Sequence, residues 1–181
     1  MNDGLIPRRY AKALLKFAHE KGQDARVYAL MQSLGDCLAS QPALGKSITN
    51  PFVNASDKAN LLTIASGATA KDSVFADFIK LLIDNNRIDL MRHIALAYLE
   101  MYRKANNIFL VSITSAAPLA DKDLARLKSV ITSHVGSASV EYETAVDPDL
   151  IGGFVVKIDS ERLDASIKNE LKQLRLKLLS K

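Results

Sequence analysis

The sequence predicts an α+β protein in which an N-terminal six-helix bundle precedes a small C-terminal domain of β-α-β-β-α order. Two observations support this fold class. Apolar residues recur with the period of a helix up to about residue 104, whereas alternating and β-branched runs appear only after Asn107. This change of period divides the chain into residues 1–105 and 106–181. With 181 residues, 48% of them hydrophobic, the chain is long enough to bury a core in each part.

Helical spacing and helix-ending residues define the first three helices. Pro7 suits the first turn of a helix, the apolar residues after it recur at helical spacing, and Gly22 ends this helix. A second helix covers Val27–Leu38. A short third helix over 43–49 stops at Asn50-Pro51, because a residue that precedes proline is disfavoured in the α region.

Capping residues place the next three helices. Asn54 or Ser56 can cap a fourth helix, and Gly67 ends it. A fifth helix runs from about Asp72 to Asn85, where apolar residues are dense. Asp89 is expected to cap the sixth helix, which leads to the change of period.

The C-terminal part is predicted to contain three strands and two helices. Ile108–Thr114 is rich in β-branched and aromatic residues, and Val140–Val146 alternates apolar with polar residues as a half-buried strand does. Between them, a helix runs from Asp121 towards Gly136. Phe154–Ile158 forms the third strand. Asp164 then caps the last helix, where an N-cap contributes about 1 kcal/mol.

Two short motifs before the third strand are interpreted as determinants of the fold. Asp147-Pro148-Asp149 forms a turn with proline at its preferred second position. Gly152-Gly153 precedes a strand, whereas a phosphate-binding loop precedes a helix, and it lacks the further glycines or the Lys of such loops. A bulge or a close approach of two backbones explains the glycine pair better. Together with Asp164, these residues are assigned structural roles.

Side chains that could support catalysis do not occur in a recognisable pattern. His19, His93 and His134 have no His or Cys three or four residues away, so the spacing gives little support to a zinc site. Cys37 lies on an apolar helix face, where a thiol usually packs in the core. We therefore expect no catalytic residue, no metal and no cofactor, and a protein that is not an enzyme.

The net charge of +4 makes nucleic-acid binding the competing hypothesis. All of the excess lies in residues 1–106, and Arg8, Arg9, Lys12 and Lys16 share one side of the first helix. A basic adaptor that binds RNA is the alternative function, although a solvated helix face explains such a patch more simply. The longest stretch without charged residues, Ala105–Ala120, is too short and too polar to span a membrane.

Two helices are apolar over a wider arc than packing on one core requires. Apolar residues span about 200° of the first helix and about 220° of the fifth, against roughly 100° for a helix that faces a single core. Either these helices are central and buried on several sides, or they leave a groove that receives an amphipathic helix from another protein. The residues alone leave both interpretations open.

Three segments of the chain together resemble the delta subunit of bacterial F-type ATP synthase, whose mitochondrial relative is the oligomycin-sensitivity-conferring protein. The segments are Arg8-Arg9-Tyr10-Ala11-Lys12-Ala13-Leu14, Leu82-Ile83-Asp84-Asn85-Asn86-Arg87-Ile88, and Val146-Asp147-Pro148-Asp149-Leu150-Ile151-Gly152-Gly153-Phe154-Val155-Val156-Lys157-Ile158 with Leu163-Asp164-Ala165-Ser166-Ile167-Lys168. The resemblance covers the whole chain in the right order. One departure is Asn86, which stands where the family often has Gly.

The resemblance implies a non-catalytic stator subunit at the cytoplasmic face of the bacterial plasma membrane. Residues 1–105 would bind the catalytic head, and residues 106–181 would meet the C-terminus of the peripheral-stalk b subunits, so that rotation is coupled to ATP synthesis. It also implies that the N-terminal helix of an alpha subunit lies in a groove between the first and fifth helices. The residues expected to contact it are Tyr10, Ala13, Leu14, Phe17, Phe75, Phe78, Ile79 and Leu82.

Overall fold

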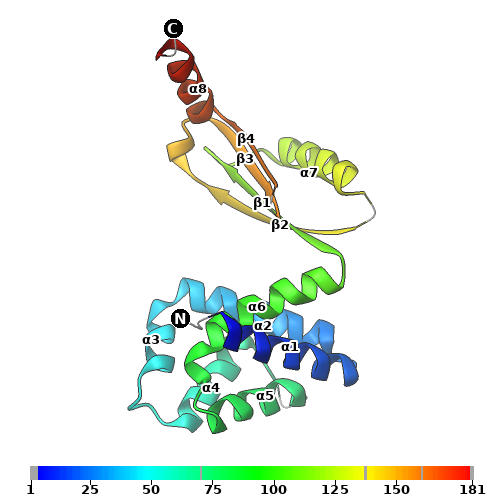
Figure 1. Cartoon of the computed structure of the whole chain (residues 1–181), viewed down its shortest axis with the longest axis vertical. Helices are drawn as coiled ribbons and strands as arrows, with labels where there is room; N and C mark the ends of the chain where they lie inside the picture. Colours follow the sequence, from blue (N-terminus) through cyan, green and yellow to red (C-terminus); the bar gives the residue numbers. More distant parts are fainter. Residues whose placement is uncertain (1–3, 70, 137, 160, 180–181) are drawn as a thin grey trace. The chain divides into compact units, whose positions relative to one another are not determined.

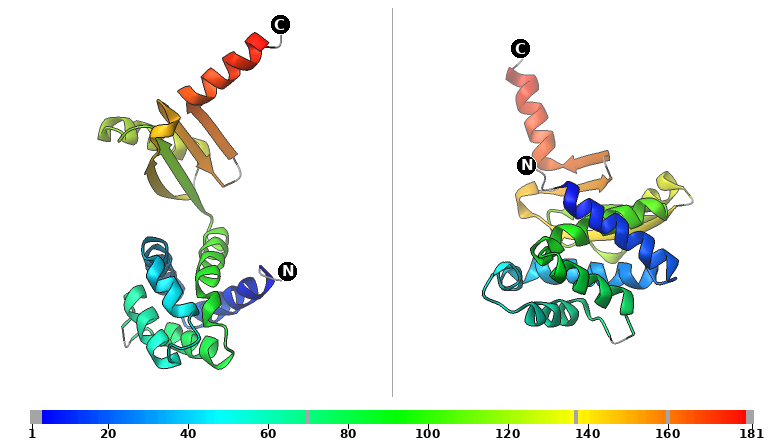
Figure 2. Two further views of the ribbon diagram at one scale, coloured as in Figure 1. Left: turned by 90° about the vertical axis from the view of Figure 1, so that its left-hand side faces the viewer. Right: turned by 60° about the horizontal axis from the view of Figure 1, so that its bottom comes forward.

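The computed structural model describes the chain except residues 1–3, 70, 137, 160 and 180–181. The chain divides into two compact units, Met1–Tyr102 and Arg103–Lys181. Helices form the first unit, and a four-stranded sheet with two helices forms the second (Figures 1 and 2). The predicted mixture of helix and sheet is therefore confirmed. No helix in the described part of the chain is both long and apolar enough to span a bilayer.

The helices of the first unit follow the predicted order, with one correction at the sixth. Asp89 does not cap that helix; it lies inside a short 3-10 turn that leads directly into it. Asn86, between α5 and η1, has a φ of +53°, a conformation that Asn tolerates better than most residues. The elements are α1 (Leu5–Glu20), α2 (Asp24–Ser40), α3 (Pro42–Thr49), α4 (Ala55–Ser66), α5 (Ser73–Asp84), η1 (Ile88–Leu90) and α6 (Met91–Ala105).

The core of the first unit is built around α2, α5 and α6. The α6 residues Ile94, Ala95 and Tyr98 are completely inaccessible to solvent. Aromatic side chains extend this packing, because the ring of Tyr102 stacks on those of Tyr28 and Tyr98. α1 contributes a narrower stripe of buried residues, namely Pro7, Ala11, Leu14 and Ala18. α1 is therefore buried on one side only, and its wide apolar arc is not explained by a central position.

A nearly buried carboxylate ties α2 to the segment between α4 and α5. The guanidinium of Arg26 donates two hydrogen bonds to Asp72, of 2.9 and 3.0 Å, and the backbone N–H of Thr69 donates a third, of 2.7 Å. The hydrogen bond from Arg26 is the largest cause that holds the pKa of Asp72 well below its usual range. This cluster fixes the position at which α5 begins.

The second unit contains one strand more than predicted. Its sheet has the order β2-β1-β3-β4, with β1 parallel to β2 and antiparallel to β3, and β3 antiparallel to β4. The predicted β-α-β-β-α order is therefore wrong, and the observed order is β-α-β-β-β-α. The elements are β1 (Ile108–Ser115), α7 (Asp121–Val135), β2 (Ser139–Val146), η2 (Pro148–Leu150), β3 (Gly153–Ile158), β4 (Glu161–Ser166) and α8 (Ile167–Leu179).

α7 covers one face of this sheet (Figure 1). Val111 and Ile113 of β1 and Val156 of β3 pack with Ile131 of α7 in a buried cluster. Neighbouring side chains that are partly buried surround the cluster. The second unit thus has a hydrophobic core of its own.

The junction before α8 corrects the role assigned to Asp164. This residue lies in β4, and its carboxylate accepts hydrogen bonds from the backbone N–H and the hydroxyl of Ser166, of 3.1 and 2.6 Å. The Ser166 hydroxyl in turn accepts from the N–H of Asn169, so Ser166 is the residue that caps α8. Asp164 therefore does not cap α8 itself but holds the capping residue Ser166 in place. The reason is that β4 extends to Ser166, so the helix begins later than expected.

The other predicted structural residues lie between the end of β2 and the first residue of β3. Asp147 accepts a hydrogen bond from the N–H of Asp149, and Pro148 begins η2. Gly153 has a φ of +77°, and a side chain there would overlap the backbone of Ala165 on β4. The close approach of two backbones expected at the glycine pair is therefore present.

Candidate protein-docking site

The structure separates the eight predicted contact residues into two groups. Leu14, Phe75, Phe78, Ile79 and Leu82 are buried in the first unit, with at most 4% of each residue exposed. Tyr10 and Phe17 are half-buried, and Ala13 is exposed. All four predicted residues of α5 therefore belong to the core of the first unit, and the accessible residues of the set lie on α1.

The accessible residues of α1 lie on one side of the helix. Tyr10, Ala13 and Phe17 are spaced by three and four residues, which places them in one row along the helix. The ammonium group of Lys21 lies 5.8 Å from the centre of the Phe17 ring, so this row ends beside a positive charge. The small side chain of Ala13 leaves room in the middle of the row for close approach of another helix.

α5 contacts α1 within the first unit. α5 also exposes 44% of Leu81, which was not among the eight predicted residues. The width of the apolar arc on α5 was the signal for an exposed apolar residue there, but periodicity does not reveal which member of the arc is left uncovered.

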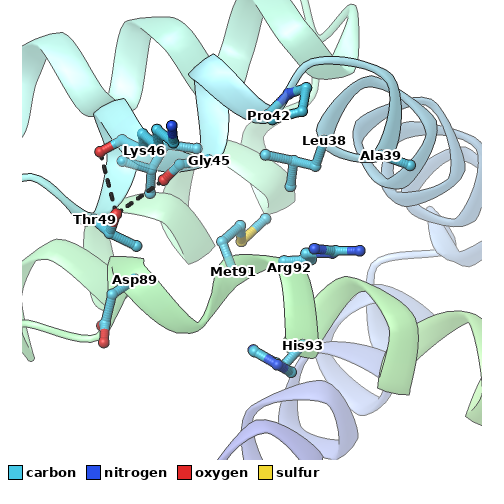
Figure 3. Close-up of a pocket in the computed structure, with 11 residues that line it drawn as sticks. Leu38, Ala39, Pro42, Gly45, Lys46, Thr49, Asp89, Met91, Arg92 and His93 are labelled. Atoms are coloured by element: carbon cyan, nitrogen blue, oxygen red, sulfur yellow. Dashed lines mark hydrogen bonds between the residues drawn. The ribbon is translucent and has the colours of Figure 1, made fainter.

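A hollow of about 390 Å³ lies between α2, α3 and α6 of the same unit (Figure 3). Its lining includes apolar Leu38 and Met91 together with charged Lys46, Asp89 and Arg92. The nearby hydroxyl of Thr49 is already used, because it donates to the carbonyl groups of Gly45 and Lys46 within its own helix.

Two further features of the described residues bear on the competing interpretations of the sequence. The described residues contain no group of three or more His, Cys, Asp or Glu side chains arranged to hold a metal ion. The basic side of α1 is mixed in sign, because Arg8 lies 3.6 Å from Glu100 of α6 and both side chains are exposed. An ion pair of this kind is typical of a solvated protein surface.

Comparisons with known proteins match this chain along almost its whole length. The family model described as ATP synthase delta (OSCP) subunit matches residues 6–178. The ATP synthase subunit delta of Bacteroides thetaiotaomicron is 35% identical over 182 residues, covering 100% of this chain and 97% of the relative. That of Phocaeicola vulgatus is 33% identical over 178 residues, covering 98% of this chain and 96% of the relative.

A solved structure supports the fold independently. A chain of the mitochondrial ATP synthase hexamer of Toxoplasma gondii, determined by cryo-electron microscopy, superposes with a TM-score of 0.73. The alignment covers 96% of this chain and 97% of that chain at 21% sequence identity. At this identity the similarity establishes a shared fold.

Proposed function

This chain belongs to the ATP synthase delta (OSCP) subunit family, and we propose that its two units divide the work of a stator between the catalytic head and the peripheral stalk. The chain is a non-catalytic component of the ATP synthase complex. A stator holds the head still while the central rotor turns, so that ion flow is coupled to ATP synthesis. In this role the chain binds at the cytoplasmic face of the bacterial plasma membrane through protein contacts.

The first unit binds the catalytic head through the row Tyr10, Ala13 and Phe17 on α1. The occupant of this row is the amphipathic N-terminal helix of an alpha subunit, held in the helix-in-groove mode. α1 is apolar over a much wider arc than its buried stripe uses, and this surplus supports the proposal. The α5 residues Phe75 and Phe78 are buried in the core of the same unit, so in this proposal they stabilise the bundle that presents α1.

The second unit meets the C-terminal end of the peripheral-stalk b subunits. It is a separate compact body with its own core, so it can hold the stalk while the first unit holds the head. Neither contact requires catalytic chemistry. The surplus apolar surface of α1 is the single observation on which the head contact depends most.

Calorimetric titration of the full chain with a synthetic peptide of the alpha-subunit N-terminal helix tests the head contact. The Phe17→Ser variant is expected to weaken binding about tenfold or more, because a large apolar side chain is lost from the interface. Ala13→Glu is expected to weaken it similarly by filling the space that the partner helix needs.

Ile64→Ser is the matched control, because Ile64 is an exposed apolar residue on α4 in the same unit. It should leave the affinity unchanged, and all three variants should keep the circular dichroism of the parent chain. If the parent chain does not bind the peptide at micromolar concentration, or if Ile64→Ser weakens binding as much as Phe17→Ser, the α1 site is wrong.

A further inference from the structure

The hollow between α2, α3 and α6 has an apolar floor. Leu38, Ile48 and Met91 form this floor, and each of them is at most 5% exposed. Figure 3 shows the Met91 side chain in the middle of the lining residues, extending towards the space between α3 and Leu38 of α2. The volume of the hollow, about 390 Å³, lies in the range of small-ligand pockets, which are also mostly apolar. The hollow therefore has the size and the floor of a site for an apolar chain.

Gly45 keeps this hollow open. It lies inside α3, where glycine weakens a helix relative to alanine because it has more backbone freedom to lose on folding. The fold does not require a glycine at this position, because its φ is not positive and a Cβ there would have no neighbouring atom within 4 Å. Since Gly45 lines the hollow, a larger side chain would occupy part of its space. The glycine thus preserves space that the described side chains leave empty.

Positive charge predominates at the rim of the hollow. The polar side chains in the lining are those of Lys46, Thr49, Asp89, Arg92 and His93. Lys46, Arg92 and Asp89 are exposed, and none of the three forms an ion pair with another described residue. Two full positive charges therefore stand against a single negative charge. This balance favours an anionic group over a cationic one at the rim.

The lining provides charges but few other groups that could bind a ligand by hydrogen bonds. It comes mainly from helices, whose backbone groups bond within each helix. The Thr49 hydroxyl is also used, because it donates to carbonyl groups of its own helix. An extended peptide would leave its backbone without partners here. An alkyl chain needs no such partners, so one chain with one charged headgroup fits the lining better.

We propose that this hollow binds a single-chain anionic amphiphile, such as a medium-chain carboxylate. The alkyl chain lies on the apolar floor and passes close to α3 at Gly45. The headgroup lies at the rim near Lys46 and Arg92, which supply the opposite charge. The site belongs to the first unit alone, so it does not depend on the proposed stator contacts of the two units.

Nuclear magnetic resonance of the full chain, labelled with carbon-13 at the methionine methyl groups, tests this proposal with decanoate as the probe. The Met91 signal, identified from its loss in Met91→Leu, should shift and saturate with a Kd below about 1 mM. Met31 is completely buried and does not line the hollow, so its signal should stay in place. Hexanoate, with a shorter chain, and decyltrimethylammonium, with a positive headgroup, should each bind at least about tenfold more weakly.

Filling the hollow should block the probe. In Gly45→Leu the new side chain occupies the space that the glycine leaves, so decanoate should no longer bind. This variant should keep the circular dichroism of the parent and a thermal stability no lower, since leucine favours a helix more than glycine does. Ala43→Leu is the matched control, because Ala43 is exposed on α3 and does not line the hollow, and this variant should bind decanoate like the parent.

Reversing the charge of the rim provides a second readout, which stays decisive if Gly45→Leu does not fold. The Lys46→Glu/Arg92→Glu double variant should bind decanoate at least about tenfold more weakly than the parent does, and decyltrimethylammonium more tightly. Lys80→Glu changes an exposed residue of α5 outside the hollow and should leave both affinities unchanged.

An unresponsive Met91 signal in the parent would overturn the proposal, and so would an equal shift of Met31, which would indicate general loosening of the bundle. Decanoate binding by a folded Gly45→Leu, or an unchanged preference for the anion in the charge-reversed variant, would overturn it as well. A Met91 shift with phosphatidylglycerol vesicles but not with decanoate would overturn it in favour of a membrane-surface contact. A shift only with a helical peptide rich in Leu and Glu would overturn it in favour of a protein partner.

Discussion

At the residue scale, the bonds of Asp72 show how one carboxylate can hold several segments of the bundle together. Its side chain is 7% exposed, whereas the Arg26 side chain is 48% exposed and remains accessible to water. Asp72 also accepts hydrogen bonds from the N–H and the hydroxyl of Thr69. Removing the carboxylate leaves these donors unpaired, while removing the arginine leaves a charge with little access to solvent. Both changes are expected to destabilise the first unit.

The depressed pKa of Asp72 makes the stability of the first unit dependent on pH. The ionised form is favoured in the folded state, so its contribution is complete above the unfolded pKa of about 3.9 and is lost as pH falls through the lower folded pKa. Asp72→Asn should lower the free energy of unfolding by about 2 kcal/mol at pH 7. Urea titrations of both proteins should show this difference shrinking below about pH 4.

The control for the Asp72→Asn variant is a second carboxylate in the first unit. Asp77→Asn changes an exposed carboxylate on α5 and should alter stability by less than about 0.5 kcal/mol. A difference between parent and Asp72→Asn that stays constant from pH 7 to pH 3 would show that the Asp72 charge is not the source of the stabilisation.

Burial also limits which single residues could be assigned to a docking site from the sequence. Phe17 and Phe78 both lie on wide apolar arcs, yet Phe17 is half-buried and Phe78 is 4% exposed. Helical period assigns a residue to a side of its helix but does not specify what covers that side. A charge at Phe78 is therefore expected to unfold the bundle, whereas a polar residue at Phe17 can report on a contact.

At the scale of elements, the helices of the first unit were predictable because their periods and ending residues agree. Gly67 ends α4 in the left-handed conformation, as its position after the apolar run predicts. β4 was not predictable in the same way. Its sequence has a single large apolar residue, Leu163, which is 62% exposed, and its other positions carry mostly charged or small side chains. Such a composition is typical of an edge strand and lacks the alternation that marks a half-buried one.

The junction of β4 and α8 yields a prediction for the helix as a whole. Ser166→Ala removes the acceptor for the Asn169 N–H and one of the donors to Asp164, so it should destabilise the second unit by about 1 kcal/mol. Amide hydrogen exchange should become faster in the first turn of α8 and stay unchanged in α5. Ser139→Ala, at the exposed start of β2, is the control. Unchanged exchange in α8 would show that its first turn does not depend on this cap.

At the scale of the whole molecule, the sequence indicated two units because the period of its apolar residues changes once. The sequence did not predict which side chains each unit leaves exposed, because exposure depends on neighbours that are distant in sequence. Leu14 is covered whereas Ala13 beside it is exposed, and Leu163 was not expected to lie in a strand at all. The family resemblance implies a partner for each unit, and the burial of individual side chains reduces the proposed contacts on α1 to three.

A chain that acts as a mechanical link must remain continuous between its two docking sites. Asn106 and Asn107 join α6 to β1 and both are exposed, so a protease recognition sequence inserted there should be tolerated. Before cleavage, the assembled enzyme should couple ATP hydrolysis to proton pumping. After cleavage, each unit should stay on its own partner, but covalent transmission of torque is lost, so hydrolysis should continue while pumping in membrane vesicles falls to background. An insertion without the recognition sequence controls for added length, and pumping that persists after complete cleavage would show that the chain does not carry the load between head and stalk.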